Sequence, residues 1–147
     1  MSAPSPLPTY IYKILPNTSP YTGTPIPIPS SWEFPKTQMD LGDGFVHLST
    51  VRQLPSTLTR FYSTKEDLEK GVQLLKVDYG RLSAWKILKW EKSRSNGESY
   101  PHLYGALTGE SVRDLRLVKR TGKKGDEKGE SWEDVVERLK NEGWLED

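Results

Sequence analysis

The chain contains two histidines, and each lies in a short segment whose composition suits a β-strand. His47 lies in Phe-Val-His-Leu-Ser-Thr (residues 45–50), and His102 lies in Tyr-Pro-His-Leu-Tyr-Gly (residues 100–105). Alternate side chains of a strand share a face, so we expect Ser49 beside His47 and Tyr104 beside His102. If the two strands are neighbours, these four groups form one patch that can bind a polar ligand and exchange a proton near pH 7.

Other interpretations of these residues stay open. Each histidine also fits a half-buried strand position where backbone groups satisfy its ring. Glu91 follows Trp90 at a predicted strand end. It fits a catalytic carboxylate, or a charge that marks where the strand leaves the core, which is the more common case. Lys13, Arg52 and Arg60 are cations near the predicted patch, available to a phosphate or a carboxylate, or else solvated surface charges.

Several kinds of chemistry are excluded by what the chain lacks. It has no cysteine, which excludes a disulfide scaffold, a thiolate nucleophile and a Cys-based zinc or iron–sulfur site. Two histidines cannot form a His-rich cage, so no metal site is expected. Ser49 lacks the Gly-x-Ser-x-Gly surroundings of a hydrolase nucleophile. Neither a Walker-type nor a dinucleotide-type glycine motif occurs.

Length and charge set further bounds. A chain of 147 residues is typical of one domain. Its 21 Lys and Arg nearly balance 20 Asp and Glu, a net charge of +1 that argues against general DNA binding. No apolar run approaches the roughly 20 residues of a membrane span, and the N-terminus does not resemble a signal peptide. We therefore expect a cytoplasmic protein without membrane contact.

The pattern along the chain predicts the elements that position these residues. Strands are predicted at 10–15, 45–49, 72–79, 87–91, 100–107 and 112–118, and helices begin at Thr50 and Ser63. Residues 1–9 are expected to be a flexible tail, 16–35 a proline-rich loop with aromatic and aliphatic anchors, and 119–130 a mobile charged linker. Residues 131–147 are predicted to form a C-terminal amphipathic helix, docked on the sheet or bound to a partner protein. These patterns indicate an α+β fold with one domain over residues 10–118.

Five segments of the chain resemble the domain-of-unknown-function family numbered 952. They are residues 12–14, 44–50, 53–62, 88–91 and 100–107. The resemblance spans residues 10–118, and the proline-rich loop and charged C-terminal extension fall outside it. That family is similar to ADP-ribosyltransferases, whose bent, split β-sheet grips NAD in a cleft. The resemblance therefore implies a bent, split mixed sheet flanked by short helices, with NAD as a substrate.

The same resemblance implies roles for individual residues. His47 and Ser49 would lie near the nicotinamide and its ribose, and Lys13, with Tyr12, occupies the place where a His or Arg commonly opens the site. His102 stands where the family of transferases usually has a catalytic Glu. A carboxylate near the sugar stabilises the oxocarbenium-like transition state, and a histidine cannot supply that charge. Relatives that act on an RNA 2′-phosphate use His and Arg instead, because the attacking phosphate is itself anionic.

The leading hypothesis is a cleft that binds NAD or another phosphorylated nucleotide, with ADP-ribosyl or RNA 2′-phosphotransferase-like transfer. The expected catalytic residues are His47, His102 and Ser49. The expected cofactor-binding residues, which include two phosphate-holding cations and two stacking rings, are Tyr12, Lys13, Thr50, Arg60, Phe61, Tyr104 and Glu91. Two alternatives stay open: a non-catalytic module on the same fold that binds a nucleotide or a protein, and a scaffold whose proline-rich loop or terminal helix binds a protein partner.

Overall fold

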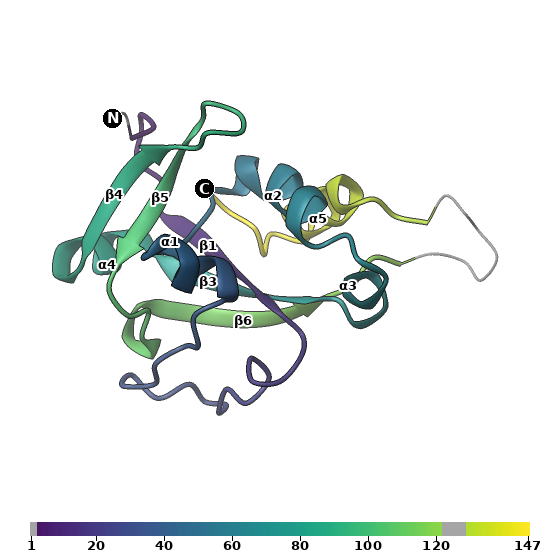
Figure 1. Ribbon diagram of the computed structural model, residues 1–147, viewed down its shortest axis with the longest axis horizontal. Helices are drawn as coiled ribbons and strands as arrows, with labels where there is room; N and C mark the ends of the chain where they lie inside the picture. The colour runs from purple at the N-terminus through teal and green to yellow at the C-terminus, as the bar shows by residue number, and fades with distance from the viewer. Residues whose placement is uncertain (1–2, 122–128) are drawn as a thin grey trace.

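The computed structural model describes residues 3–121 and 129–147, and it shows a mixed α+β domain with two antiparallel sheets of three strands (Figure 1). The first sheet has the strand order β1-β3-β6, from β1 (Tyr10–Pro16), β3 (Val72–Asp78) and β6 (Val112–Val118). The second has the order β2-β5-β4, from β2 (Val46–His47), β5 (Ser99–Tyr104) and β4 (Ile87–Lys92). The predicted α+β class is confirmed, and each predicted strand is present, although β2 and β5 are shorter than expected.

The helices are short and lie between the strands or after them. In chain order they are α1 (Gln38–Asp43), η1 (Val51–Gln53), α2 (Leu54–Phe61), α3 (Lys65–Lys70), α4 (Tyr79–Trp85), η2 (Gly109–Ser111) and α5 (Trp132–Asn141). The sequence analysis did not predict α1 or α4. Each has a single buried residue, so neither shows the apolar stripe on which a helix prediction depends.

The two sheets are joined where β1 meets the chain just after β2. The backbone N–H of Tyr12 donates to the carbonyl of Ser49 at 2.8 Å, and the N–H of Ser49 donates to the carbonyl of Tyr12 at 2.9 Å. One residue further on, the N–H of Leu48 donates to the carbonyl of Pro101 at 3.1 Å. This junction brings Lys13 on β1 close to His47 on β2.

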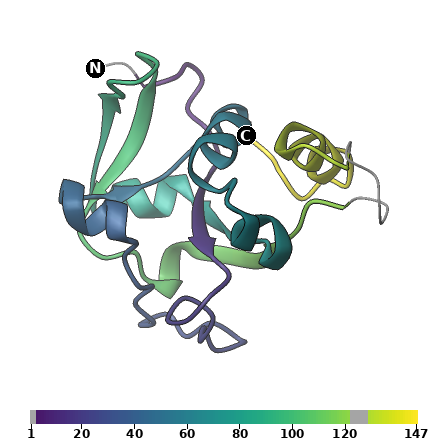
Figure 2. The ribbon, with the colours of Figure 1, turned by 45° about the vertical axis from the view of Figure 1, so that its right-hand side comes forward.

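The first sheet separates two apolar cores, because alternate residues of β1 face opposite sides. Ile11 and Leu15 pack with the second sheet, whereas Tyr12 and Ile14 pack against α2 and α5. The buried side chains of α5 complete this second core: Trp132, Val135, Val136 and Leu139. The C-terminal helix is therefore docked on the first sheet, on the side of the molecule away from the β4–β5 hairpin (Figure 2).

The proline-rich segment lies along the lower edge of the molecule in Figure 1. Residues 17–37, all described by the structure, form no helix or strand beyond the bridge between Glu33 and Thr108. Tyr21 and Phe34 anchor the segment in the first core, as predicted. The backbone passes so close to Gly109 that a Cβ there would lie 2.0 Å from the Pro29 carbonyl oxygen, so this position requires glycine.

Residues 119–130 were predicted to be a mobile linker, and 122–128 of them lie outside the described residues. Thr121 and Glu130, which flank that stretch, are held together: the Thr121 N–H donates to the Glu130 carboxylate at 2.8 Å, and Arg138 of α5 donates to the same group at 2.9 Å. Within the parts of the chain that the structure describes, no helix has the length and apolarity needed to cross a membrane.

Candidate functional site

A cavity of about 550 Å³ opens between α1, β2, α2 and the turn that joins β4 to β5. Its size falls in the range of small-molecule sites in proteins, roughly 300–1,000 Å³. Both histidines line it. They face each other directly in the β2–β5 ladder, with ring centroids 5.6 Å apart. The two strands with matching sequences are therefore neighbours, and their imidazoles share one cleft.

His102 is held by a carboxylate on the next strand. Its Nδ1 lies 2.9 Å from Glu91 Oε1, which also accepts a 2.6 Å hydrogen bond from the Tyr104 hydroxyl. The bonds from Tyr104 and then His102 hold the pKa of Glu91 below its ordinary value, so the group is an ionised acceptor. Burial lowers the pKa of His102, although Glu91 acts in the opposite direction. At pH 7 the ring is thus neutral, with its proton on Nδ1 and a lone pair on Nε2.

His47 lies between two carboxylates of α1. Its Nδ1 is 2.7 Å from Asp40 Oδ1, and its Nε2 is 2.9 Å from Asp43 Oδ2. The Asp40 side chain is fully buried, whereas 52% of the Asp43 side chain is exposed. The two histidines therefore share a cleft but have different partners.

Lys13 is committed to the protein itself. Its ammonium donates to Asp40 Oδ1 at 3.0 Å and to the carbonyl of His47 at 3.1 Å, and it forms an ion pair with Asp40 Oδ2 at 2.8 Å. Its side chain is 4% exposed, so the ammonium is held inside the protein by these contacts. The side chain was expected to hold phosphate, but this geometry gives it a structural role in the wall of the cleft.

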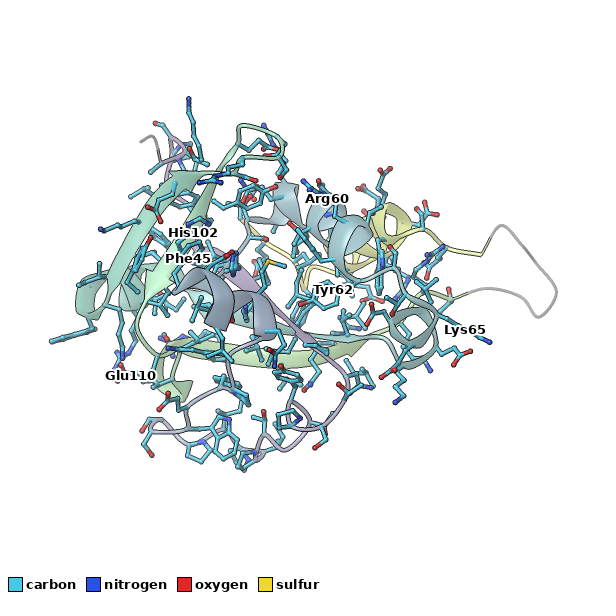
Figure 3. The ribbon with its side chains drawn as sticks, viewed as in Figure 1. Phe45, Arg60, Tyr62, Lys65, His102 and Glu110 are labelled. Carbon is cyan, nitrogen blue, oxygen red and sulfur yellow. The ribbon has the colours of Figure 1, made fainter. Side chains whose placement is uncertain are left out.

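Aromatic rings cover part of the cleft. Phe45 stacks on His102 with ring centroids 3.9 Å apart and an interplanar angle of 23°, and its ring centroid lies 4.6 Å from that of His47. Figure 3 shows Phe45 and His102 together, with Arg60 and Tyr62 on the other side of the opening. Phe45 thus keeps the two imidazoles in place and limits access to one face of His102.

The ten residues expected at the site divide into three groups. Six of them line the cavity: His47, His102, Ser49, Lys13, Arg60 and Phe61. Ser49 is 4% exposed, and its hydroxyl lies 3.4 Å from that of Thr57. Glu91 and Tyr104 do not line the cavity; Glu91 bonds to His102 and accepts a hydrogen bond from Tyr104.

Tyr12 and Thr50 were expected to bind the cofactor, and the geometry corrects both assignments. Tyr12 is fully buried on the opposite face of β1 from Lys13, where its hydroxyl donates to the Glu146 carbonyl at 2.9 Å. Thr50 caps the short η1 helix through its capping box with Gln53. Strand alternation explains the first error, because adjacent residues of a strand cannot both face the same cleft.

Four further charged residues line the cleft that the sequence analysis did not select: Asp40, Asp43, Lys92 and Arg94. Asp40 had an available signal, since Thr37 and Asp40 have the spacing of a helix capping box, but the signal says nothing of a site. Lys92 is the last residue of β4 and Arg94 lies in the polar turn after it, where charged residues are ordinary. Arg52, in contrast, is exposed and paired with Glu98 at 3.0 Å.

The cationic residues of the other wall differ from Lys13. Arg60 of α2, Lys92 at the end of β4 and Arg94 of the β4–β5 turn line the cleft, and none of them forms an ion pair with an acidic residue in the described parts of the chain. Arg60 lies over the Phe61 ring at 5.3 Å. The arrangement can therefore do two things: accept a proton at His102 and bind an anionic group opposite it.

Comparison with known proteins finds a family and a fold. Residues 29–115 match the family described as "Protein of unknown function (DUF952)". The crystal structure of protein CC0527 from Caulobacter crescentus is similar, with a TM-score of 0.62 and 30% identity over 78% of this chain and 90% of that chain. The solution NMR structure of CC0527 gives a TM-score of 0.56 at 30% identity, over 78% and 88%. No curated protein matches significantly. None of these descriptions names an activity.

Proposed function

This chain belongs to the DUF952 family of proteins of unknown function, and from its own site we propose that the cleft binds NAD or a similar phosphorylated nucleotide. The proposed reaction transfers the ADP-ribosyl group of that nucleotide to an acceptor. One observation carries the proposal. His102, bonded to Glu91, lines a cavity that is also lined by cations without an acidic partner among the described residues. A neutral imidazole with a free lone pair and a set of cations are what a group transfer from a phosphorylated ligand requires.

The phosphate-binding part of the proposal rests on Arg60, Lys92 and Arg94. A diphosphate carries two negative charges, and charge-assisted hydrogen bonds from guanidinium groups are the strongest that side chains offer to it. These three cations replace Lys13, which the sequence analysis had assigned to phosphate. Phe61, 46% exposed at the cleft, supplies a surface on which a base can stack.

The transfer step breaks the bond between nicotinamide and the ribose C1′. The bonding electron pair leaves with the ring, so nicotinamide departs neutral, and an acceptor oxygen forms the new bond to C1′. If the acceptor is a hydroxyl, its proton passes to Nε2 of His102; if it is the 2′-phosphate of an RNA, the anionic oxygen attacks with no proton to remove. Asp43 supplies a half-exposed carboxylate in the cavity wall, which can stabilise positive charge on the sugar.

The arrangement of the sheets also supports the proposal. The two three-stranded sheets meet only at the Tyr12–Ser49 bridge among the described strand contacts, and the cleft opens beside that junction. Such a divided sheet is compatible with the split sheet that the resemblance to ADP-ribosyltransferases implies.

Titration calorimetry with NAD, followed by incubation with labelled NAD and either a 2′-phosphorylated RNA or a protein acceptor, tests the proposal. We expect binding by the wild type and release of nicotinamide with an acceptor present. His102→Gln should bind NAD but lower the rate by about 10²–10⁴-fold, the usual contribution of general acid–base catalysis. Absence of NAD binding at millimolar concentration, with both acceptors unchanged, would overturn the proposal.

A second candidate function is a non-catalytic module that binds the same nucleotide. The observation that favours it is the Phe45 ring stacked 3.9 Å from His102, which covers one face of the imidazole. This candidate predicts NAD binding without nicotinamide release, and it predicts that His102→Gln changes affinity alone. The rate measurement therefore separates the two functions.

A further inference from the structure

Asp40 is the most heavily bonded side chain of the site. Its fully buried carboxylate accepts hydrogen bonds from the backbone N–H of Thr37 at 3.1 Å and of His47 at 3.0 Å. It also bonds to His47 Nδ1 at 2.7 Å, accepts a hydrogen bond from Lys13 at 3.0 Å, and forms an ion pair with the same ammonium. One residue thereby ties together β1, α1 and β2. Such a number of donors is far more than a helix cap needs.

Two other helices show what capping alone requires. Asp67 of α3 and Asp134 of α5 occupy the same position in their capping boxes as Asp40 in α1. Each accepts the N–H of its capping residue, Thr64 or Ser131; Asp67 is half-buried and Asp134 is exposed. The contacts of Asp40 with Lys13 and His47 are therefore additional to its role in the helix.

The bonds of His47 determine the state of its ring. Burial opposes ionisation of Asp40, but the hydrogen bonds from His47 and the charge of Lys13 outweigh it and hold the pKa of Asp40 well below its ordinary value. An ionised carboxylate only accepts, so Nδ1 of His47 must donate to Asp40. Nε2 faces the carboxylate of Asp43 and must donate too. A histidine that donates from both nitrogens is the imidazolium cation.

We propose that Asp40 is a positioning residue that keeps His47 doubly protonated, so that His47 serves the cleft as a fixed cation and donor while His102 alone accepts protons. The role in the cleft rests on the proposed function, whereas the effect of Asp40 on the His47 ring does not. Active sites divide acid and base roles between two titratable groups by placing them in environments that move their pKa values apart.

Charged and titratable groups face His47 from every element packed against it. The anions are Asp40 and Asp43 of α1, the cation is Lys13 of β1, and the partner across the ladder is His102 of β5, which Glu91 of β4 holds. The nearest groups are thus two carboxylates, of which Lys13 offsets one. Their balance favours a positive ring at position 47.

Nitrogen-15 spectra of the histidine rings in the wild-type protein test this directly, with no nucleotide present. At pH 7 we expect His47 to carry protons on both nitrogens and His102 to carry one on Nδ1 alone. A neutral His47 at pH 7, or two rings in the same state, would overturn the inference. This result does not depend on NAD binding, so it stands or fails separately from the proposed function.

A variant pair then identifies Asp40 as the cause. Asp40→Asn alone leaves the buried Lys13 without its partner, so the tested variant is Lys13→Met with Asp40→Asn, which removes both charges. We expect the doubly protonated fraction of His47 at pH 7 to fall at least twofold while the His102 signals stay in place. Asp67→Asn removes a matching capping carboxylate and should leave both rings unchanged. Asp40 has no such role if the double variant keeps His47 fully doubly protonated, or if Asp67→Asn lowers the doubly protonated fraction as much as the double variant does. If the double variant does not fold, the wild-type spectrum decides.

Discussion

The two walls of the cleft carry positive charge in opposite ways. On the wall formed by β1, α1 and β2, the Lys13 ammonium is buried, paired with the Asp40 carboxylate and bonded to the His47 carbonyl. On the wall formed by α2 and the β4–β5 turn, Arg60 and Arg94 line the cleft without an acidic partner among the described residues. The comparison teaches that a cation in a cleft wall is not by itself a ligand contact; what matters is whether its donors are already used.

The physical reason is the cost of burying charge. An ammonium taken out of water must be paired and hydrogen-bonded, or its burial costs several kcal/mol. Lys13 therefore stabilises the wall only through Asp40, and it cannot leave that pair for a phosphate without exposing a buried carboxylate. Cations at the exposed rim of the cleft stay in contact with water, so they are not desolvated and remain available to an incoming anion.

The largest expected effect comes from breaking the buried pair. Lys13→Met leaves Asp40 buried without its cation, and we expect a loss of about 3–5 kcal/mol in the free energy of unfolding. Urea denaturation measures it. Lys70→Met is the matched control, because Lys70 pairs with Glu66 on the surface of α3 and such pairs contribute about 0–1 kcal/mol. Equal losses of unfolding free energy in the two variants would mean that the buried and the exposed ion pair contribute equally to stability.

The second effect falls on ligand affinity and comes from the other wall. Arg60→Ala removes a charge-assisted contact, so we expect NAD to bind about tenfold to a hundredfold more weakly, from the roughly 1.5–3 kcal/mol that such bonds contribute. Stability should stay within about 0.5 kcal/mol of the wild type, as for surface substitutions in general. Calorimetry checks the affinity. The control is Lys65→Ala on α3, away from the cleft (Figure 3), which should bind NAD as the wild type does.

A third prediction concerns the pH dependence of stability and the protonation of His102. Folding lowers the pKa of His102 below its ordinary value near 6.5, so the unfolded chain binds the extra proton first. The contribution of His102 to stability is therefore greatest above about pH 6.5, and it declines as the pH falls through that value toward the lower folded pKa. His102→Gln should flatten this decline between pH 7 and pH 5 in urea titrations. An unchanged slope would show that His102 is not the group held neutral by burial.

The smallest expected effect lies outside the cleft. Tyr12→Phe removes a buried hydroxyl bonded at 2.9 Å to both the carbonyl and the N–H of Glu146, which should lower stability by about 0.5–1.5 kcal/mol. NAD affinity should not change, because Tyr12 faces the second core. A loss of affinity would return Tyr12 to the site where the sequence analysis placed it.

The sequence predicted the strands better than it predicted which side chains would pair with one another. Runs of β-forming residues between turn signals located the six strands, and the matching segments around His47 and His102 suggested a shared patch if their strands were neighbours, which the β2–β5 ladder confirms. No local pattern shows that Asp40, 27 residues from Lys13 along the chain, comes within 3.0 Å of it. The phosphate role assigned to Lys13 was therefore an error about pairing, which only the fold determines.

Short elements account for the other differences. The six residues of α1 are stabilised by the Thr37–Asp40 capping box and end at Gly44, whose φ of 82° favours glycine, and none of this produces an apolar period. The same spacing from Ser131 to Asp134 begins α5, where buried Trp132 and Leu139 reveal the helix. A capping signal without an apolar stripe is easily missed, and here it contained the central carboxylate of the site.

The most direct test of the whole interpretation is a titration of isotope-labelled wild-type protein with NAD, followed by nuclear magnetic resonance at the side chains of both walls. We expect the Nε2 signal of His102 and the guanidinium signal of Arg60 to shift together with one dissociation constant, while the Lys13 ammonium signal keeps its position. Movement of neither His102 nor Arg60 at millimolar NAD would contradict the assignment of this cleft to a phosphorylated nucleotide.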